Sequence, residues 1–117
     1  MDTDALLQKY RLHAQRFGQA SEPDLVNQAH EELLKVREAL RDSGQAMRIL
    51  ELLADESEDV CLWAGFDALH LSPEDGLRVL RALADGPPSK ASSEAEMTLW
   101  VRERGDLVLV PWEDDES

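Results

Sequence analysis

Two ten-residue segments, 46–55 and 76–85, repeat each other at an offset of thirty residues. AMRILELLAD aligns with GLRVLRALAD, and five positions are identical: Arg, Leu, Leu, Ala and Asp. Apolar residues in each copy recur at the three- and four-residue spacings of an amphipathic helix, and a turn and a second helical segment follow. Repeated helix pairs are the unit of an α-solenoid, in which each pair buries a face against its neighbour. The repeat therefore predicts an all-α fold, a short solenoid in which the two segments superpose.

Start and stop signals divide the chain into six predicted helices. Ser21 is expected to be the N-cap of the second helix, with Pro23 in its first turn. Gly18, Gly44 and Gly105 are expected to end helices. An apolar stripe along the second helix predicts that it packs against the first as an antiparallel hairpin. The expected helices cover 4–17, 21 to the break at 42–44, 45–54, 58–70, 72–84 and 93–104.

The third of these helices is short and strongly apolar. At 100° per residue, the spacing predicts that Ala46, Ile49, Leu50 and Leu53 face inward. Leu50 and its counterpart Leu80 in the second copy are therefore expected to be core positions.

The chain is strongly acidic. It has 25 acidic residues against 12 basic ones, a formal net charge of −13 over 117 residues. This charge repels nucleic acid and anionic membranes and favours another protein with a basic surface as the partner. The alternative is that the surplus serves only solubility. The acidic start and the short apolar runs predict a cytoplasmic protein without a signal peptide or membrane span.

The length fits a single domain, and we expect that domain to cover residues 1–112. An acidic tail, 113–117, is expected to be disordered. The apolar run Leu107–Trp112 has two interpretations: it folds back to close the last repeat, or it offers an edge to another chain. The expected parts are an N-terminal helical hairpin (4–43), repeat one (44–71), repeat two (72–105) and an extended segment (106–112).

The chain resembles HEAT repeats in the pattern Asp59-Val60 followed by Ala64, Ala68 and Leu69, although Cys61 stands where arginine is common. Over about residues 33–105 it is similar to a small bacterial HEAT-like family, the domain of unknown function numbered two-thousand-nineteen. That resemblance rests on the segments SPEDGLRVL and AEMTL. It implies an α-helical repeat fold, and it implies no activity, cofactor or catalytic residue.

No catalytic, cofactor or metal site is expected, and the chain is not predicted to be an enzyme. Cys61 is the single cysteine, which excludes an internal disulfide and favours a buried, inert thiol over a nucleophile. Asp55 begins a pattern like that of a calcium loop, but Val60 and Phe66 occupy its sixth and twelfth positions. The three histidines lack a second ligand at helical spacing, except for carboxylates: His13, His30 and His70.

Two tryptophans mark a candidate binding face. Trp63 lies in the polar sector of the predicted helix 58–70, which spans about 80°. Trp100 lies on the outer side of helix 93–104. Either ring can simply cover core, but exposed Trp beside carboxylates is also typical of a hot spot for a basic partner. The predicted partner-binding residues are Asp59, Trp63, Asp67, His70, Glu96, Trp100 and Glu103.

These features favour a non-catalytic protein-binding module. The most concrete hypothesis is an immunity protein or antitoxin that neutralises a basic toxic effector such as a nuclease, because an acidic surface can occlude a basic active site. The alternatives are a general adaptor or regulator, or a small-ligand-binding helical protein that uses the concave groove. The oligomeric state is left open.

Overall fold

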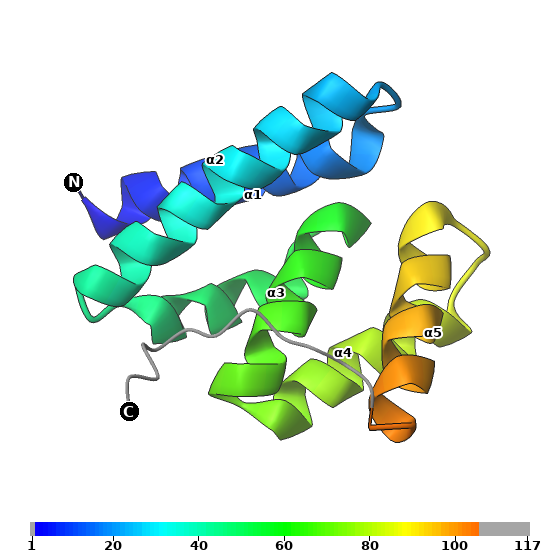
Figure 1. Ribbon diagram of the computed structural model, residues 1–117. Helices are drawn as coiled ribbons and strands as arrows, with labels where there is room; N and C mark the ends of the chain where they lie inside the picture. Colours follow the sequence, from blue (N-terminus) through cyan, green and yellow to red (C-terminus); the bar gives the residue numbers. More distant parts are fainter. Residues whose placement is uncertain (1, 106–117) are drawn as a thin grey trace.

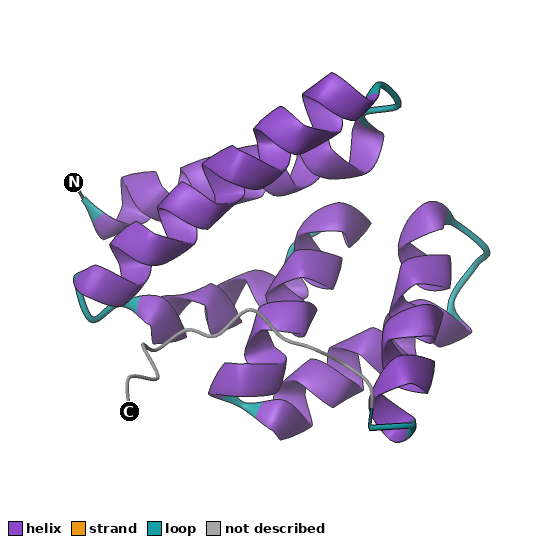
Figure 2. Ribbon diagram, viewed as in Figure 1, coloured by secondary structure: helices purple, strands orange, loops and turns teal. Residues whose placement is uncertain are grey.

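The computed structural model describes residues 2–105, and the regular secondary structure in that range is entirely helical (Figures 1 and 2). The predicted all-α class is confirmed. The predictions for 106–112 and 113–117 lie outside the described residues. The elements are α1 (Thr3–Gln19), α2 (Pro23–Asp42), the 3₁₀ helix η1 (Ala46–Ala54), α3 (Glu58–Leu71), α4 (Pro73–Asp85) and α5 (Lys90–Glu103).

The first two helices form the predicted hairpin and lie side by side (Figure 1). The stripe that was expected to face α1 is buried at Ala29, Leu33, Val36 and Leu40. Gly44 ends the hairpin as predicted. Its φ of 74° is a backbone conformation that residues with a side chain rarely adopt. This conformation lets the Gln45 N–H donate to the Leu40 carbonyl at 2.8 Å, as in a Schellman motif.

Three helix ends differ from the prediction. Gly18 does not end α1, which continues to Gln19. Ser21 does not cap α2, whose N-cap is Glu22 with no side-chain cap bond. The last helix begins at Lys90 rather than residue 93, because Ser89 and Ser92 form a reciprocal capping box. A cap depends on local backbone geometry, which residue type alone does not fix.

The segment expected to be a short α-helix is a 3₁₀ helix, η1. With three residues per turn, the residues that share a face lie at intervals of three. Ile49 and Leu52 are accordingly the buried residues, whereas Leu50 is half-buried. The two repeated segments therefore do not share one helical geometry, because 76–85 lies within the α-helix α4.

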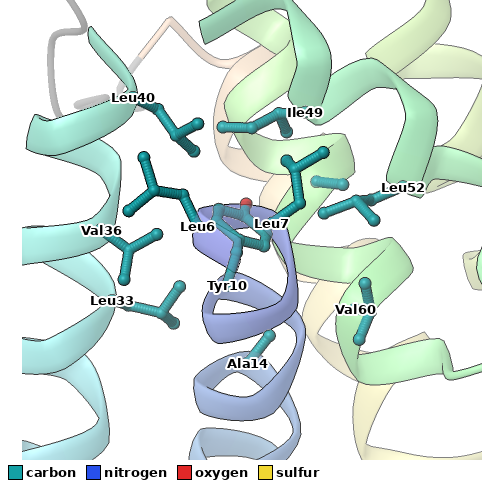
Figure 3. Packing of buried hydrophobic residues seen from close by; sticks show 11 residues of the cluster. Leu6, Leu7, Tyr10, Ala14, Leu33, Val36, Leu40, Ile49, Leu52 and Val60 are labelled. Carbon is teal, nitrogen blue, oxygen red and sulfur yellow. The ribbon is translucent and has the colours of Figure 1, made fainter. Parts of the chain in front are cut away.

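Two groups of buried side chains make up the core, and α3 contributes to both. The larger group joins α1, α2, η1 and α3, and Figure 3 shows Leu33, Val36 and Leu40 of α2 facing α1. The smaller group joins α3 to α4 and α5 around the fully buried Leu80. Successive helices pack in pairs, consistent with a short helical repeat fold. No described helix has both the length and the apolar character that crossing a membrane requires.

Candidate functional site

An apolar hollow lies between the end of α1, the middle of α3 and α5. Its volume is about 270 Å³. From α1 comes Phe17, and the other walls consist of two helical faces at three- and four-residue spacing. They are Leu62, Trp63 and Phe66 on α3, and Glu94, Met97 and Thr98 on α5.

Aromatic rings build one wall of this hollow. The Trp63 ring meets Phe17 edge to face, with centroids 5.2 Å apart and planes at 89°. Phe66, one turn further along α3, packs against the same indole with centroids 6.3 Å apart, and the centroid of the His30 ring of α2 lies 6.0 Å from that of the indole. Such edge-to-face pairs are favourable arrangements of aromatic quadrupoles. Trp63 is therefore half-buried, and it both covers the core of the hairpin and lines the hollow.

Three elements meet at one end of the hollow around Asp59. Asp59 lies three, four and seven residues before the α3 residues of the wall, and so on the same helical face. Its carboxylate lies against Gly18, where a Cβ atom would collide with it. Lys90 of α5 reaches the same point and donates to the Gly18 carbonyl at 3.1 Å. Gly18 is thus a place of close approach rather than a helix end.

The Asp59 carboxylate has an unusual environment for a surface acid. Within residues 2–105 it makes no hydrogen bond or ion pair. Burial raises the pKa of Asp59 above its ordinary value, Lys90 opposes that rise, and Glu58 adds to it. Within residues 2–105 the ionised side chain therefore has the nearby charge of Lys90 but no directly bonded counter-ion.

Asp67 was predicted to lie on the binding face, and this prediction is wrong. It is 1% exposed. The Tyr10 hydroxyl donates to its Oδ2 at 2.6 Å, and the Arg37 guanidinium lies 2.8 Å from its Oδ1. The hairpin covers this side of α3 and supplies polar partners from α1 and α2. A polar residue on a helical wheel can thus mark a buried ionic contact as well as an exposed sector.

The residues predicted on α5 do not line the hollow. Trp100 is 52% exposed, and its ring already carries the Arg104 guanidinium 4.6 Å from its centroid. It lies about 110° around the helix from the Glu94–Thr98 face. Glu96 and Glu103 are exposed on α5, and His70 is exposed near the end of α3.

Of the predicted partner-binding residues, Trp63 lines the hollow and Asp59 lies beside it, whereas the other lining residues were not predicted. Phe17 and Phe66 fall among the apolar positions of their predicted helices, and Met97 carried no signal, although it is 59% exposed. The available signal was aromatic clustering, because Trp63 and Phe66 are three residues apart on one helix. That Phe17 joins them depends on the packing of α1 over α3.

The lone thiol lies apart from this hollow and is buried. The Cys61 Sγ is 3.0 Å from the Asp55 carbonyl oxygen, to which it donates. Burial raises the pKa of the thiol, and the nearby Asp55 charge adds to the effect. A raised pKa lowers the thiolate fraction, so Cys61 is poorly suited to nucleophilic chemistry.

A second, more polar hollow of about 650 Å³ lies between α1 and α2. His13 lines it, and the His13 Nδ1 atom is buried without a hydrogen-bond partner in the described part of the chain. Burial lowers the pKa of this imidazole, which favours its neutral form. The same range, 2–105, holds no cluster of three potential metal ligands.

Comparison of the chain with protein-family models, curated proteins and solved structures gives no match. The resemblance to the HEAT-like family therefore stays a prediction.

Proposed function

We propose that the chain is a non-catalytic protein-binding module that holds a basic protein over the hollow between α1, α3 and α5. The observation that carries this proposal is an accessible aromatic wall with a poorly compensated carboxylate at one end. Aromatic residues dominate the binding energy of protein interfaces when they fill or line desolvated pockets. Here the wall consists of Phe17, Trp63 and Phe66, and Asp59 adjoins it.

The exposed apolar surface of the hollow supports a partner that covers it. Met97 is 59% exposed on the α5 side, and its thioether can adapt to different occupants. Two carboxylates accompany this apolar surface, Glu94 in the wall and Asp59 at the end. A positively charged protein would be steered toward them by a chain with a net charge of −13.

The size of the hollow favours a protein side chain over a small ligand. Pockets for drug-sized molecules run from about 300 to 1,000 Å³. The volume of about 270 Å³ lies just below that range. One or two side chains of a docked protein fit such a space, with the rest of the interface spread over neighbouring acidic surface.

Within this class, the finer proposal is an immunity protein or antitoxin that occludes a basic effector such as a nuclease. An acidic surface with an apolar anchor point can compete with nucleic acid for a basic active site. A general adaptor would use the same hollow but would bind without inhibiting. The proposed HEAT-like repeat architecture serves either role, since helical repeats offer extended surfaces to partners.

A matched pair of methionine variants tests the proposal. Met97 lines the hollow, whereas Met47 is similarly exposed at 55% but belongs to η1. Tagged wild type, Met97→Lys and Met47→Lys would be used to capture partners from the cells of origin. We expect wild type and Met47→Lys to retain the same basic protein, which salt releases. Met97→Lys should weaken that complex by about thirty-fold or more, as for a hot spot.

Equal loss or equal retention in the two variants would contradict the role of the hollow. The purified partner then separates the two finer functions. An immunity protein abolishes the activity of the effector at equimolar amounts and protects cells that express it. An adaptor forms the same complex and leaves that activity intact.

A further inference from the structure

We infer that the occupant of the hollow is an apolar side chain of the partner carried beside an arginine or lysine, and that this cation pairs with Asp59. The inference rests on the proposed function and names the chemistry that its site recognises. An apolar side chain alone would be enough to cover the apolar lining residues Phe17, Trp63 and Met97. The cation supplies the direct ion pair that Asp59 does not make within residues 2–105, where Lys90 lies near it but bonds to Gly18.

The separation of the two subsites fits two neighbouring side chains of one partner segment. Asp59 and Trp63 are four residues apart on α3, so their Cβ atoms lie about 5–6 Å from each other. An apolar residue and a basic residue on one face of a partner helix have the same spacing. A single such segment can therefore reach the aromatic wall and the carboxylate together.

The structure shows why a partner cation would gain at Asp59. The Gly18 backbone lies against the carboxylate, so that a Cβ atom at this position would displace the Asp59 side chain. The half-buried acid is consequently desolvated without a bonded counter-ion in residues 2–105. A charged group that loses water on one side gains more from an ion pair than a fully solvated group does.

Lys90 is the positively charged residue of the chain that would compete with a partner cation for Asp59. Its ammonium is bonded to the Gly18 carbonyl rather than to Asp59, and the side chain is exposed. An incoming guanidinium can donate to a carboxylate through two parallel N–H groups, which an ammonium cannot do. Arginine is therefore the preferred form of the partner cation.

Three small probes separate the apolar and cationic contributions without a known partner. The full chain would be titrated with 2-phenylethylguanidinium, with the neutral isostere 2-phenylethylurea, and with methylguanidinium. The indole N–H resonance of Trp63 reports binding, and its assignment follows from its loss in Trp63→Phe. The Trp100 indole, outside the lining, serves as an internal control.

At low salt we expect 2-phenylethylguanidinium to bind about five-fold more tightly than the urea, the gain of one partly desolvated ion pair. Methylguanidinium, which lacks the apolar body, should bind at least about ten-fold more weakly. Asp59→Asn should reduce the guanidinium-to-urea ratio to about one. Lys90→Gln should increase that ratio, because it removes the competing cation.

Glu96→Gln is the matched control for a general loss of negative charge, because Glu96 is exposed and does not line the hollow. This variant should keep the five-fold ratio. A ratio that survives in Asp59→Asn, or that falls equally in Glu96→Gln, would overturn the assignment to Asp59.

Other results overturn the inference while leaving the proposed function separately testable. Equal binding of the guanidinium and the urea would make the hollow a purely apolar anchor. No shift of the Trp63 indole with any probe would remove the hollow as a side-chain site. In both cases the comparison of Met97→Lys with Met47→Lys still decides whether a protein binds there.

Discussion

The ionised form of Asp59 lowers the free energy of unfolding. Its folded-state pKa is raised by burial, so its contribution to stability is fully present below the ordinary value of 3.8 and is lost as the pH rises. We expect Asp59→Asn to be more stable than wild type at pH 7. Urea unfolding at pH 7 and at pH 3 measures this gain. It should disappear toward pH 3, where Asp59 is protonated.

The exposed variant Glu96→Gln controls for the release of general charge repulsion in a chain of net charge −13. A smaller free energy of unfolding for Asp59→Asn than for wild type at pH 7 would contradict this expectation. Loss of stability would mean that the carboxylate has a favourable partner in solution. A residue kept at the expense of stability fits a binding role, which links this measurement to the proposed site.

At the scale of single elements, two serines make a matched test of helix capping. Ser89 accepts a hydrogen bond from the Ser92 amide at 3.0 Å, and the Ser92 hydroxyl accepts from the Ser89 amide at 2.8 Å. Ser21, which was predicted to be a cap, is exposed before α2 and caps nothing. We expect Ser89→Ala to cost about 1 kcal/mol of unfolding free energy and Ser21→Ala less than about 0.5 kcal/mol.

Thermal or urea unfolding of the two serine variants gives the comparison directly. Equal costs would indicate that α2 begins one residue earlier in solution than in the structure. A negligible cost for Ser89→Ala would show that the capping box does not hold the start of α5.

The leucines of η1 test its helical type. In a 3₁₀ helix Leu52 lies on the buried face with Ile49, whereas an α-helix would bury Leu50 instead. We expect Leu52→Ala to cost about 2–5 kcal/mol and Leu50→Ala clearly less, as measured by chemical denaturation. Leu80→Ala, at a fully buried α4 position, is the reference for a complete core deletion. A larger cost at Leu50 than at Leu52 would restore the α-helical prediction.

For the whole molecule, a buried ionic contact ties the hairpin to α3. Asp67 joins Tyr10 of α1 and Arg37 of α2, and all three are almost completely buried. Asp67→Ala would leave the Arg37 charge buried without its carboxylate, and we expect a cost of about 3–5 kcal/mol. Asp42→Ala, at an exposed ion pair with Arg41, should cost less than about 1 kcal/mol.

Calorimetric or urea melts of the two aspartate variants measure the difference. Similar small costs would mean that the hairpin docks on α3 through apolar packing alone. Because the same contact orients α1, its loss should also disturb the placement of Phe17 in the hollow.

Alkaline pH acts on the same contact through the single tyrosine of the chain. Burial raises the pKa of Tyr10 well above its ordinary value of 10.0, and the adjacent Asp67 charge raises it further. Its contribution to stability is therefore fully present below pH 10 and is lost as the pH rises toward the folded-state pKa. We expect tyrosinate absorbance to appear together with unfolding, above the pH at which the urea-unfolded chain titrates.

Tyr10→Phe removes this ionisation, so the unfolding free energy of the variant should fall less steeply above pH 10 than that of wild type. Loss of the hydrogen bond to Asp67 should lower that free energy at neutral pH. Tyrosinate absorbance at about pH 10 in a chain that is still folded would contradict the buried position of Tyr10.

The sequence by itself determined the all-helical class, the six helical segments, the hairpin and the ends at Gly44 and Gly105. These features depend on local periodicity and on backbone conformations that favour particular residues, so a short window of sequence contains them. Trp63 and Asp59 could be selected in the same way, from their position on one helical wheel.

Only the tertiary structure decided which polar residues are covered and where the hollow lies. Asp67 is bonded to residues 57 and 30 positions away, and the wall of the hollow combines residues of three helices. A wheel shows which residues share a face, but it cannot show which other helix covers that face or supplies a partner for a charge. Local periodicity therefore specified the helices, while the long-range packing of α1 and α5 against α3 specified where the hollow lies.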